Sequence, residues 1–229
     1  MCRRVVQKAP RSEIRVLFET VNPLPNTATT YNGAPTDTLP IVRLDGDGRR
    51  SLDLLRWGLV PSWAKDIKFG AHCINAMAET IATKPAFRDA FARGQRCIVP
   101  VDAFYEWQKT GAGKQPYAIV SADGLPLAMA GLWERWKDRG AGDPVQSFTI
   151  ITTVPNELCG AVHDRMPAIL PQEKWASWLG EREVDADELR WMILRPYPAD
   201  RMRAYPVDPR VGNVRNNDPG LFELVNIAA

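Results

Sequence analysis

Residues 96–107 read RCIVPVDAFYEW, and this stretch decides the fold class. Its β-branched and aromatic residues are typical of β-strands. Similar segments, bounded by turn-forming residues, recur along the chain as CRRVVQ, LDLLRWGLV, PYAIV, LPLAMAGLW, SFTIITT and RMRAYPV. Strands are therefore expected to dominate the structure.

Helical patterning is sparser and falls in four segments: SEIRVLFET, where Ser12 could cap, PAFRDAFARG, QEKWASWLG and DADELRWMIL. Because strands follow strands without regular intervening helices, the order predicts an α+β fold rather than a doubly wound one. We expect a mostly antiparallel sheet that could close into a barrel-like core, with flanking helices. Prolines and glycines are spread throughout and no repeat is visible, so residues 1–229 are predicted to form a single domain.

Composition sets limits on the class of protein. The chain has 229 residues, of which 45% are hydrophobic, which is enough for a buried core. No stretch approaches 18 uncharged apolar residues and the N-terminus lacks a signal-peptide layout, so a soluble, cytoplasmic protein without membrane contact is expected. A net charge of +2 does not by itself indicate nucleic-acid binding. The spacing of the four cysteines predicts free thiols rather than a disulfide framework.

Cys2 directly follows the initiator methionine in MCRR. Cysteine is small enough for aminopeptidase removal of Met1, which would leave a free α-amine beside a thiol. An α-amine has a reference pKa of about 7.7–8.0, against about 10.4 for lysine, so an appreciable fraction is neutral near pH 7.5. The pair is either a 1,2-aminothiol nucleophile or an accident of where translation starts.

Glu106 lies between Tyr105 and Trp107, and on a strand it would point to the face opposite these two rings. Two readings are open. Glu106 is either a solvent-facing residue of a half-buried strand or a carboxyl in apolar surroundings, where desolvation raises the pKa and suits general acid–base work near neutral pH.

His163 is one of two histidines and is followed by Asp164 and Arg165. A histidine can shuttle protons near pH 7, and a neighbouring arginine could hold an anion. The alternative is a structural histidine bonded to backbone in a turn. Asn75 likewise either pins a turn or orients a reacting group, because a buried amide must satisfy both its oxygen and its nitrogen.

Metal and nucleotide-phosphate sites are not predicted. Cys159 and His163 are four residues apart and His72 adjoins Cys73, but the two tight ligand pairs of structural zinc sites are absent from the sequence. The chain also has no GxxxxGK[ST], strand-linked GxGxxG or GxSxG motif. We therefore expect neither a metal nor a cofactor.

Taken together and in order, nine segments resemble the SOS-response-associated peptidase (SRAP) family of abasic-site-processing proteins. They are MCRR at 1–4, YNGAPT at 31–36, RWGLVPSW at 56–63, INAMAET at 74–80, RCIVPVDAFYEW at 96–107, AGLWE at 130–134, FTIITT at 148–153, HDRMPAIL at 163–170 and VGNVRNN at 211–217. The matching segments span nearly the whole chain.

The resemblance implies a protein that captures abasic sites in single-stranded DNA through a covalent thiazolidine, formed by Cys2 after removal of Met1. It implies that Cys2 is the nucleophile, that Asn75 is an orienting residue, and that Glu106 and His163 are the acid–base pair. Peptidase and lyase activities would accompany this capture. The expected partner is abasic single-stranded DNA, bound by a monomer that associates with the bacterial nucleoid.

The resemblance also implies DNA contacts. Arg4 and Arg165 would meet phosphates, while Trp57 and Trp63 would wedge or stack beside the lesion, as aromatic rings do in sequence-tolerant binding. Family members commonly read MCGR, YNVAPT and NARAET, so this chain departs from the pattern at three positions. One of them, Met77, removes a guanidinium from the expected DNA surface.

Two other classes of function are open from the sequence. One is a noncovalent single-strand-binding module, which would bind in a salt-labile manner. The other is a peptidase that acts on other proteins with Cys2 as its nucleophile. A denaturation-resistant adduct with abasic DNA would separate the resembled function from both.

Overall fold

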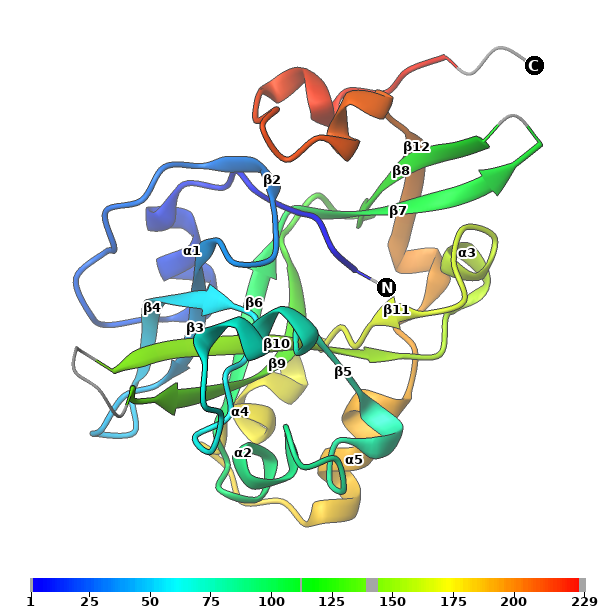
Figure 1. Cartoon of the computed structure of the whole chain (residues 1–229). Coiled ribbons are helices and arrows are strands. Elements are labelled where there is room, and N and C mark those ends of the chain that lie inside the picture. Colours follow the sequence, from blue (N-terminus) through cyan, green and yellow to red (C-terminus); the bar gives the residue numbers. More distant parts are fainter. Residues whose placement is uncertain (1, 112, 139–143, 227–229) are drawn as a thin grey trace.

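The structure is a computed structural model that describes residues 2–111, 113–138 and 144–226. Its strands form two sheets, with helices packed mainly at one end of the molecule (Figure 1). None of the described helices is long and apolar enough to cross a membrane. The four cysteines are buried free thiols.

One sheet closes into a five-stranded barrel. Its strands follow the order β10-β4-β3-β6-β9, and β9 pairs again with β10. All neighbours in this ring are antiparallel except β10 and β4, which are parallel. The strands are β3 (Thr38–Leu44), β4 (Arg50–Trp57), β6 (Arg96–Val101), β9 (Leu127–Trp136) and β10 (Val145–Thr153). Two short strands, β5 (Asn75–Met77) and β11 (Met166–Pro167), also pair with β10.

The second sheet is antiparallel throughout and has the order β12-β8-β7-β1-β2. It comprises β1 (Val5–Gln7), β2 (Thr30–Gly33), β7 (Ala103–Thr110), β8 (Gly113–Ser121) and β12 (Met202–Pro206). The predicted α+β fold with a mostly antiparallel, barrel-like sheet is therefore confirmed. The opening stretch, residues 96–107, supplies one strand to each sheet and so links them.

Strand alternation explains where the core lies. On β6, Cys97, Val99 and Val101 belong to one apolar cluster while Ile98 belongs to another, because successive side chains point to opposite faces. The first cluster fills the barrel and includes Cys2. The second lies between the outer face of the barrel and the helices.

The four predicted helical segments each contain a helix: α1 (Arg11–Phe18), α2 (Arg88–Ala92), α4 (Trp175–Leu179) and α5 (Ala186–Leu194). Ser12 does not cap α1, because the N-cap position is Pro10, which offers no side-chain acceptor. The sequence did not predict α3 (Glu157–Gly160), whose first turn is capped by Asn156 Oδ1 accepting from Cys159 N. Short 3-10 turns complete the described chain: η1 (Ile67–His72), η2 (Ala78–Thr80), η3 (Gln172–Lys174), η4 (Ala199–Arg201), η5 (Pro209–Gly212) and η6 (Pro219–Phe222).

Candidate active site

Cys2 lies where the N-terminal segment runs antiparallel to β7. Val5 pairs with Phe104, and Tyr105 N donates to Arg4 O at 3.0 Å. Before β1, the N-terminal end of the segment lies near α3 and β11 (Figure 1). Cys2 is fully buried in the apolar cluster of the barrel, and this burial raises the pKa of its thiol. The thiol is accordingly protonated at neutral pH.

The negative charge of Glu106 also raises the pKa of the Cys2 thiol, because it disfavours the thiolate. Its side chain is 4% exposed, and its Oε2 lies 3.9 Å from His163 Nε2. Burial raises the pKa of Glu106 from 4.5 to about 7, and the negative charge of Asp164 acts in the same direction. Of the two readings of Glu106, the structure supports the carboxyl in apolar surroundings.

His163 follows α3, and its ring is held from the Nδ1 side. Nδ1 lies 2.8 Å from Asp164 Oδ1 and 3.1 Å from the backbone nitrogen of Arg165. A protonated Nδ1 donates to the carboxylate, whereas a bare Nδ1 accepts from the amide, so the two contacts suit different protonation states. Burial lowers the pKa of His163, which favours the neutral ring.

Asn75 lies on β5 and is oriented by its own neighbour. Its Nδ2 donates to Ile74 O at 2.8 Å, and Trp57 Nε1 donates to the same carbonyl at 2.9 Å. Asn75 Oδ1 is buried and has no hydrogen-bond partner among the described residues. An amide oxygen held in this way is available to a bound donor.

Trp57 requires a correction. We expected it to stack or wedge against DNA, but its side chain is fully buried in the barrel, where it stacks on Phe148 with ring centroids 6.3 Å apart. On β4 it shares the inward face with Leu55, which is also buried. A buried indole offers no face to a base. Trp57 instead donates a hydrogen bond to the carbonyl of Ile74, the residue before Asn75.

Trp63 is 47% exposed, unlike Trp57. Its ring packs edge-on against Phe69, with centroids 5.0 Å apart, and its Nε1 donates to Pro85 O at 3.3 Å. The groove that it lines has a volume of about 440 Å³ and is completed by Lys65, Asp66, Lys68, Phe69 and His72. Two lysines and two aromatic rings thus lie beside one acidic residue, and aromatic rings with basic side chains are features of single-strand-binding surfaces.

The two arginines expected at phosphates differ in their surroundings. Arg4 is half-buried, its Nη1 donates to Arg3 O at 2.8 Å, and burial lowers its pKa. Arg165 is already engaged: Nη1 and Nη2 form a bidentate ion pair with Glu79 at 2.8 and 2.9 Å, and Nη2 donates to Thr152 O at 2.6 Å. Only 14% of the Arg165 side chain is exposed.

The ion pair between Glu79 and Arg165, which we call the clamp, joins two parts of the site across β10. Thr152 of β10 pairs with Met77 of β5 on one side and with Pro167 of β11 on the other. Sequence reasoning missed Glu79, because a lone acidic residue after an apolar run is most simply explained as solvent-exposed. A pairing with a residue 86 positions away leaves no local signal.

Among the described residues no group of three or more histidines, cysteines, aspartates or glutamates could hold a metal ion. The candidate site consists of a buried thiol, a carboxyl with a raised pKa, an imidazole whose pKa burial lowers, and an amide. These features define an α+β barrel protein with a candidate site around a buried cysteine near its N-terminus.

Comparison with known proteins agrees with this class. The sequence model of the SOS response associated peptidase (SRAP) family matches residues 1–214. The chain belongs to this family. It is 45% identical over 195 residues to abasic site processing protein YoqW of Bacillus subtilis, covering 85% of each chain. It is 34% identical over 219 residues to abasic site processing protein HMCES of Gallus gallus, covering 83% of this chain and 64% of that protein.

Solved structures share the fold. A protein from Bacteroides thetaiotaomicron superposes with a TM-score of 0.88 at 28% identity, covering 98% of this chain and all of the other. A protein from Bordetella bronchiseptica superposes with a TM-score of 0.78 at 29% identity, over 90% of this chain. The two-sheet arrangement is therefore that of experimentally determined relatives.

Proposed function

We propose that this chain captures abasic sites in single-stranded DNA by forming a covalent thiazolidine at Cys2 once Met1 has been removed. The observation that supports this most directly is the cluster of Cys2, Glu106 and His163, in which a carboxyl with a pKa of about 7 adjoins a buried thiol. The names of the relatives YoqW and HMCES point to abasic-site processing.

The reaction begins at the α-amine of Cys2. The ring-opened abasic sugar carries an aldehyde at C1′, which undamaged DNA lacks, so selectivity arises from reactivity. The neutral amine adds to C1′ to give a carbinolamine, which loses water to give a Schiff base. Glu106 in its protonated form donates the proton that the leaving hydroxyl needs.

Ring closure uses the thiol of the same residue. Sulfur adds to the imine carbon, the thiol proton passes to the carboxylate of Glu106, and the imine nitrogen regains a proton. The product is a five-membered thiazolidine. Because the thiol is tethered beside the imine, the effective concentration is high and the closed ring is favoured.

His163 and Asn75 serve the sugar in this scheme. The neutral imidazole of His163, whose pKa burial lowers, accepts the hydroxyl proton as the sugar ring opens. The free Oδ1 of Asn75 accepts a hydrogen bond from the Cys2 amine or from a sugar hydroxyl and so orients the reacting pair. Trp63 and Arg4 contact the flanking strand.

Two side activities follow from the same intermediates. A Schiff base acidifies the neighbouring sugar proton, so some strand cleavage by β-elimination is expected before the ring closes. The family name includes a peptidase, and in this scheme the same groups would act on the peptide bond after Met1 or on the cross-linked chain.

Intact-mass measurement with and without abasic single-stranded DNA tests the proposal. The expected result is a protein lacking Met1 whose mass rises by that of the DNA less one water, in an adduct that survives denaturant. Cys2→Ala should abolish the thiazolidine. The matched control is Cys159→Ala, another buried cysteine whose pKa the charge of Glu106 also raises, and it should still form the adduct. A full-strength adduct from Cys2→Ala would contradict the mechanism.

A further inference from the structure

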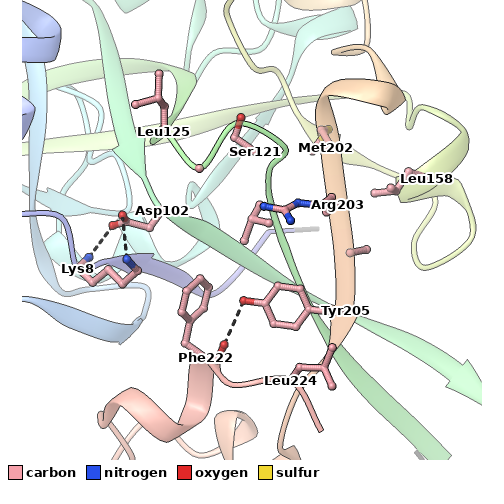
Figure 2. Close-up of a pocket in the computed structure, with 13 residues that line it drawn as sticks. Lys8, Asp102, Ser121, Leu125, Leu158, Met202, Arg203, Tyr205, Phe222 and Leu224 are labelled. Atoms are coloured by element: carbon pink, nitrogen blue, oxygen red, sulfur yellow. Dashed lines mark hydrogen bonds and ion pairs between the residues drawn. The ribbon is translucent and has the colours of Figure 1, made fainter. Parts of the chain in front are cut away.

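The second sheet carries a cavity of about 650 Å³ that the proposed chemistry does not use. Its walls come from β12, the end of β8, Lys8 just after β1, and Phe222 of η6 (Figure 2). Ligand-binding clefts in proteins commonly enclose about 300–1,000 Å³. The cavity is therefore large enough for a small molecule or for one unit of a polymer.

Arg203 is the first feature that points to a ligand. It is exposed on β12, a strand at the edge of its sheet, and its side chain extends from β12 into the cavity (Figure 2). Within residues 2–111, 113–138 and 144–226, its guanidinium makes no hydrogen bond or ion pair. An uncommitted guanidinium fork matches the geometry of a phosphate or carboxylate.

Lys8 supplies a second cation from the opposite wall. Its Nζ lies 4.0 Å from Asp102 Oδ1 and 5.6 Å from the centre of the Phe222 ring. The Asp102 carboxylate is also bonded by the backbone nitrogens of Lys8 and Ala9, at 2.6 and 3.0 Å. Because these amides already stabilise the single carboxylate, the cavity with its two cations favours an anion.

The remaining surface is apolar and partly aromatic. The rings of Tyr205 and Phe222 meet edge to face with centroids 6.0 Å apart. Leu125 and Leu224 are 53% and 63% exposed and lie toward opposite ends of the cavity (Figure 2). Exposed apolar side chains next to a free cation suit a ligand that combines an anionic group with a flat apolar body.

We propose that this cavity binds one nucleotide, with its phosphate between Arg203 and Lys8 and its base against Tyr205, Phe222 and the leucines. The nucleotide is either free or part of the DNA strand held at Cys2, and the second source rests on the proposed function. Lys8 follows Cys2 by six positions, which is at most about 22 Å of extended chain. A strand of several nucleotides could span that separation.

The test compares Arg203→Gln with Arg190→Gln, a control that removes another exposed arginine, from α5. The affinity for an undamaged 15-nucleotide single strand is measured at several salt concentrations. For the strand source, Arg203→Gln should weaken binding about threefold to tenfold and reduce the slope of log K against log salt by about 0.7, the contribution of one phosphate contact to single-strand binding. Arg190→Gln should behave as the unmodified chain.

A second arm titrates thymidine 5′-monophosphate while NMR follows the backbone amides of β12. Shifts at Arg203 and Tyr205 that Arg203→Gln removes, with DNA binding unchanged, would identify a free nucleotide as the ligand. If Arg203→Gln leaves DNA binding unchanged and thymidine 5′-monophosphate does not shift these amides in the unmodified chain, the proposal is overturned. Neither arm needs the covalent adduct, so a failure of the Cys2 chemistry would appear separately in the mass measurement.

Discussion

Glu106 shows how a single buried carboxyl links stability to reactivity. Its pKa is raised from 4.5 to about 7 because burial penalises the charged form. The folded chain therefore holds this proton more tightly than the unfolded chain does. The associated stability is full below about pH 4.5 and is lost as the pH rises toward 7. The same shift leaves the group about half ionised near neutral pH, where it can both donate and accept a proton.

Glu106→Gln should remove this pH dependence. For the unmodified chain we expect the free energy of unfolding to fall between pH 5 and pH 8 by on the order of 2–3 kcal/mol from this group. In Glu106→Gln that fall should largely vanish, because the amide does not titrate. Urea denaturation at the two pH values measures the difference. Glu157→Gln, at an exposed position, is the control and should keep the fall; an equal fall in Glu106→Gln would show that Glu106 is not the group responsible.

The rate of adduct formation gives a second prediction at this residue. Glu106→Gln should slow the capture of abasic DNA by about 10²-fold or more, the usual range for loss of a general acid–base group. The unmodified chain should show a rate that depends on a group with a pKa near 7. Single-turnover kinetics across pH 5.5–9 would test this, and an unchanged pH–rate profile in the variant would assign the proton transfers to another group.

The clamp between Glu79 and Arg165 belongs to the scale of secondary-structure elements. Glu79 follows β5, which carries Asn75, while Arg165 follows His163 and precedes β11. The Arg165 hydrogen bonds lower the pKa of Glu79, so the clamp stabilises the chain above the ordinary glutamate pKa and loses that effect as the pH falls through the lowered value. In this structure the arginine therefore connects two strands rather than offering its charge to solvent.

Glu79→Gln distinguishes the clamp from a phosphate contact. If the clamp sets the position of His163 relative to Asn75, adduct formation should slow about tenfold while DNA affinity stays within about twofold, since one charged bond of the bidentate pair is lost. If Arg165 serves mainly as a phosphate contact, the variant frees its charge and DNA affinity should rise. Glu188→Gln, which breaks the surface pair with Lys174, is the matched control and should change neither quantity. Fluorescence anisotropy and single-turnover kinetics report the two quantities.

Gly58 and Gly70 hold a close approach of two backbone segments, and Gly70 directly follows Phe69, against which Trp63 packs. A Cβ atom on Gly70 would collide with the carbonyl oxygen of Gly58, and that oxygen belongs to backbone that cannot rotate away. Gly70→Ala should therefore destabilise the chain by about 1–3 kcal/mol, the usual cost of overpacking. Gly46→Ala meets nothing within 4 Å and should be nearly neutral. Thermal unfolding compares the two, and equal melting temperatures would argue that the segments separate easily.

Element lengths explain which parts of the fold could be predicted. Most of the long strands were predicted, because β-branched and aromatic residues accumulate over five or more positions in them. The exception is the barrel strand β3 (Thr38–Leu44), which has seven residues but was not among the predicted segments. β5 and β11, with three and two residues, are too short to show a period, and their pairing with β10 is set by contacts distant in sequence. Ser12 was misjudged as a cap because Pro10 starts the helix earlier.

The candidate site could be predicted in its chemistry but not in its geometry. Cys2, Glu106 and His163 stand out by residue type, and the structure places the latter two 3.9 Å apart. Trp57 was misjudged because the aromatic motif carries no information on which face of β4 it occupies, although its parity with the buried Leu55 indicates the inward face. Glu79 was missed because its partner is far away in the sequence.

At the scale of the whole molecule, electrostatic attraction and the covalent bond contribute separately to how the DNA is held. The chain has 29 basic and 27 acidic residues, so its net charge of +2 gives only weak long-range attraction to DNA. Initial binding must then depend on local contacts at phosphates, each of which contributes about 0.7 to the slope of log K against log salt for single strands. A thiazolidine, once formed, owes nothing to these contacts.

The two contributions predict opposite salt responses before and after reaction. Binding of undamaged single-stranded DNA should weaken steeply between about 50 and 200 mM salt, and the second-order rate of capture of abasic DNA should fall in parallel, because capture requires the same encounter. The finished adduct should persist in 1 M salt and detergent. Denaturing gels of samples quenched by salt at successive times measure the rate of capture and the persistence of the adduct, with undamaged DNA of the same sequence as the control. A complex with abasic DNA that dissociates on addition of salt would favour the noncovalent single-strand-binding module, since only contacts with phosphates would then hold the DNA.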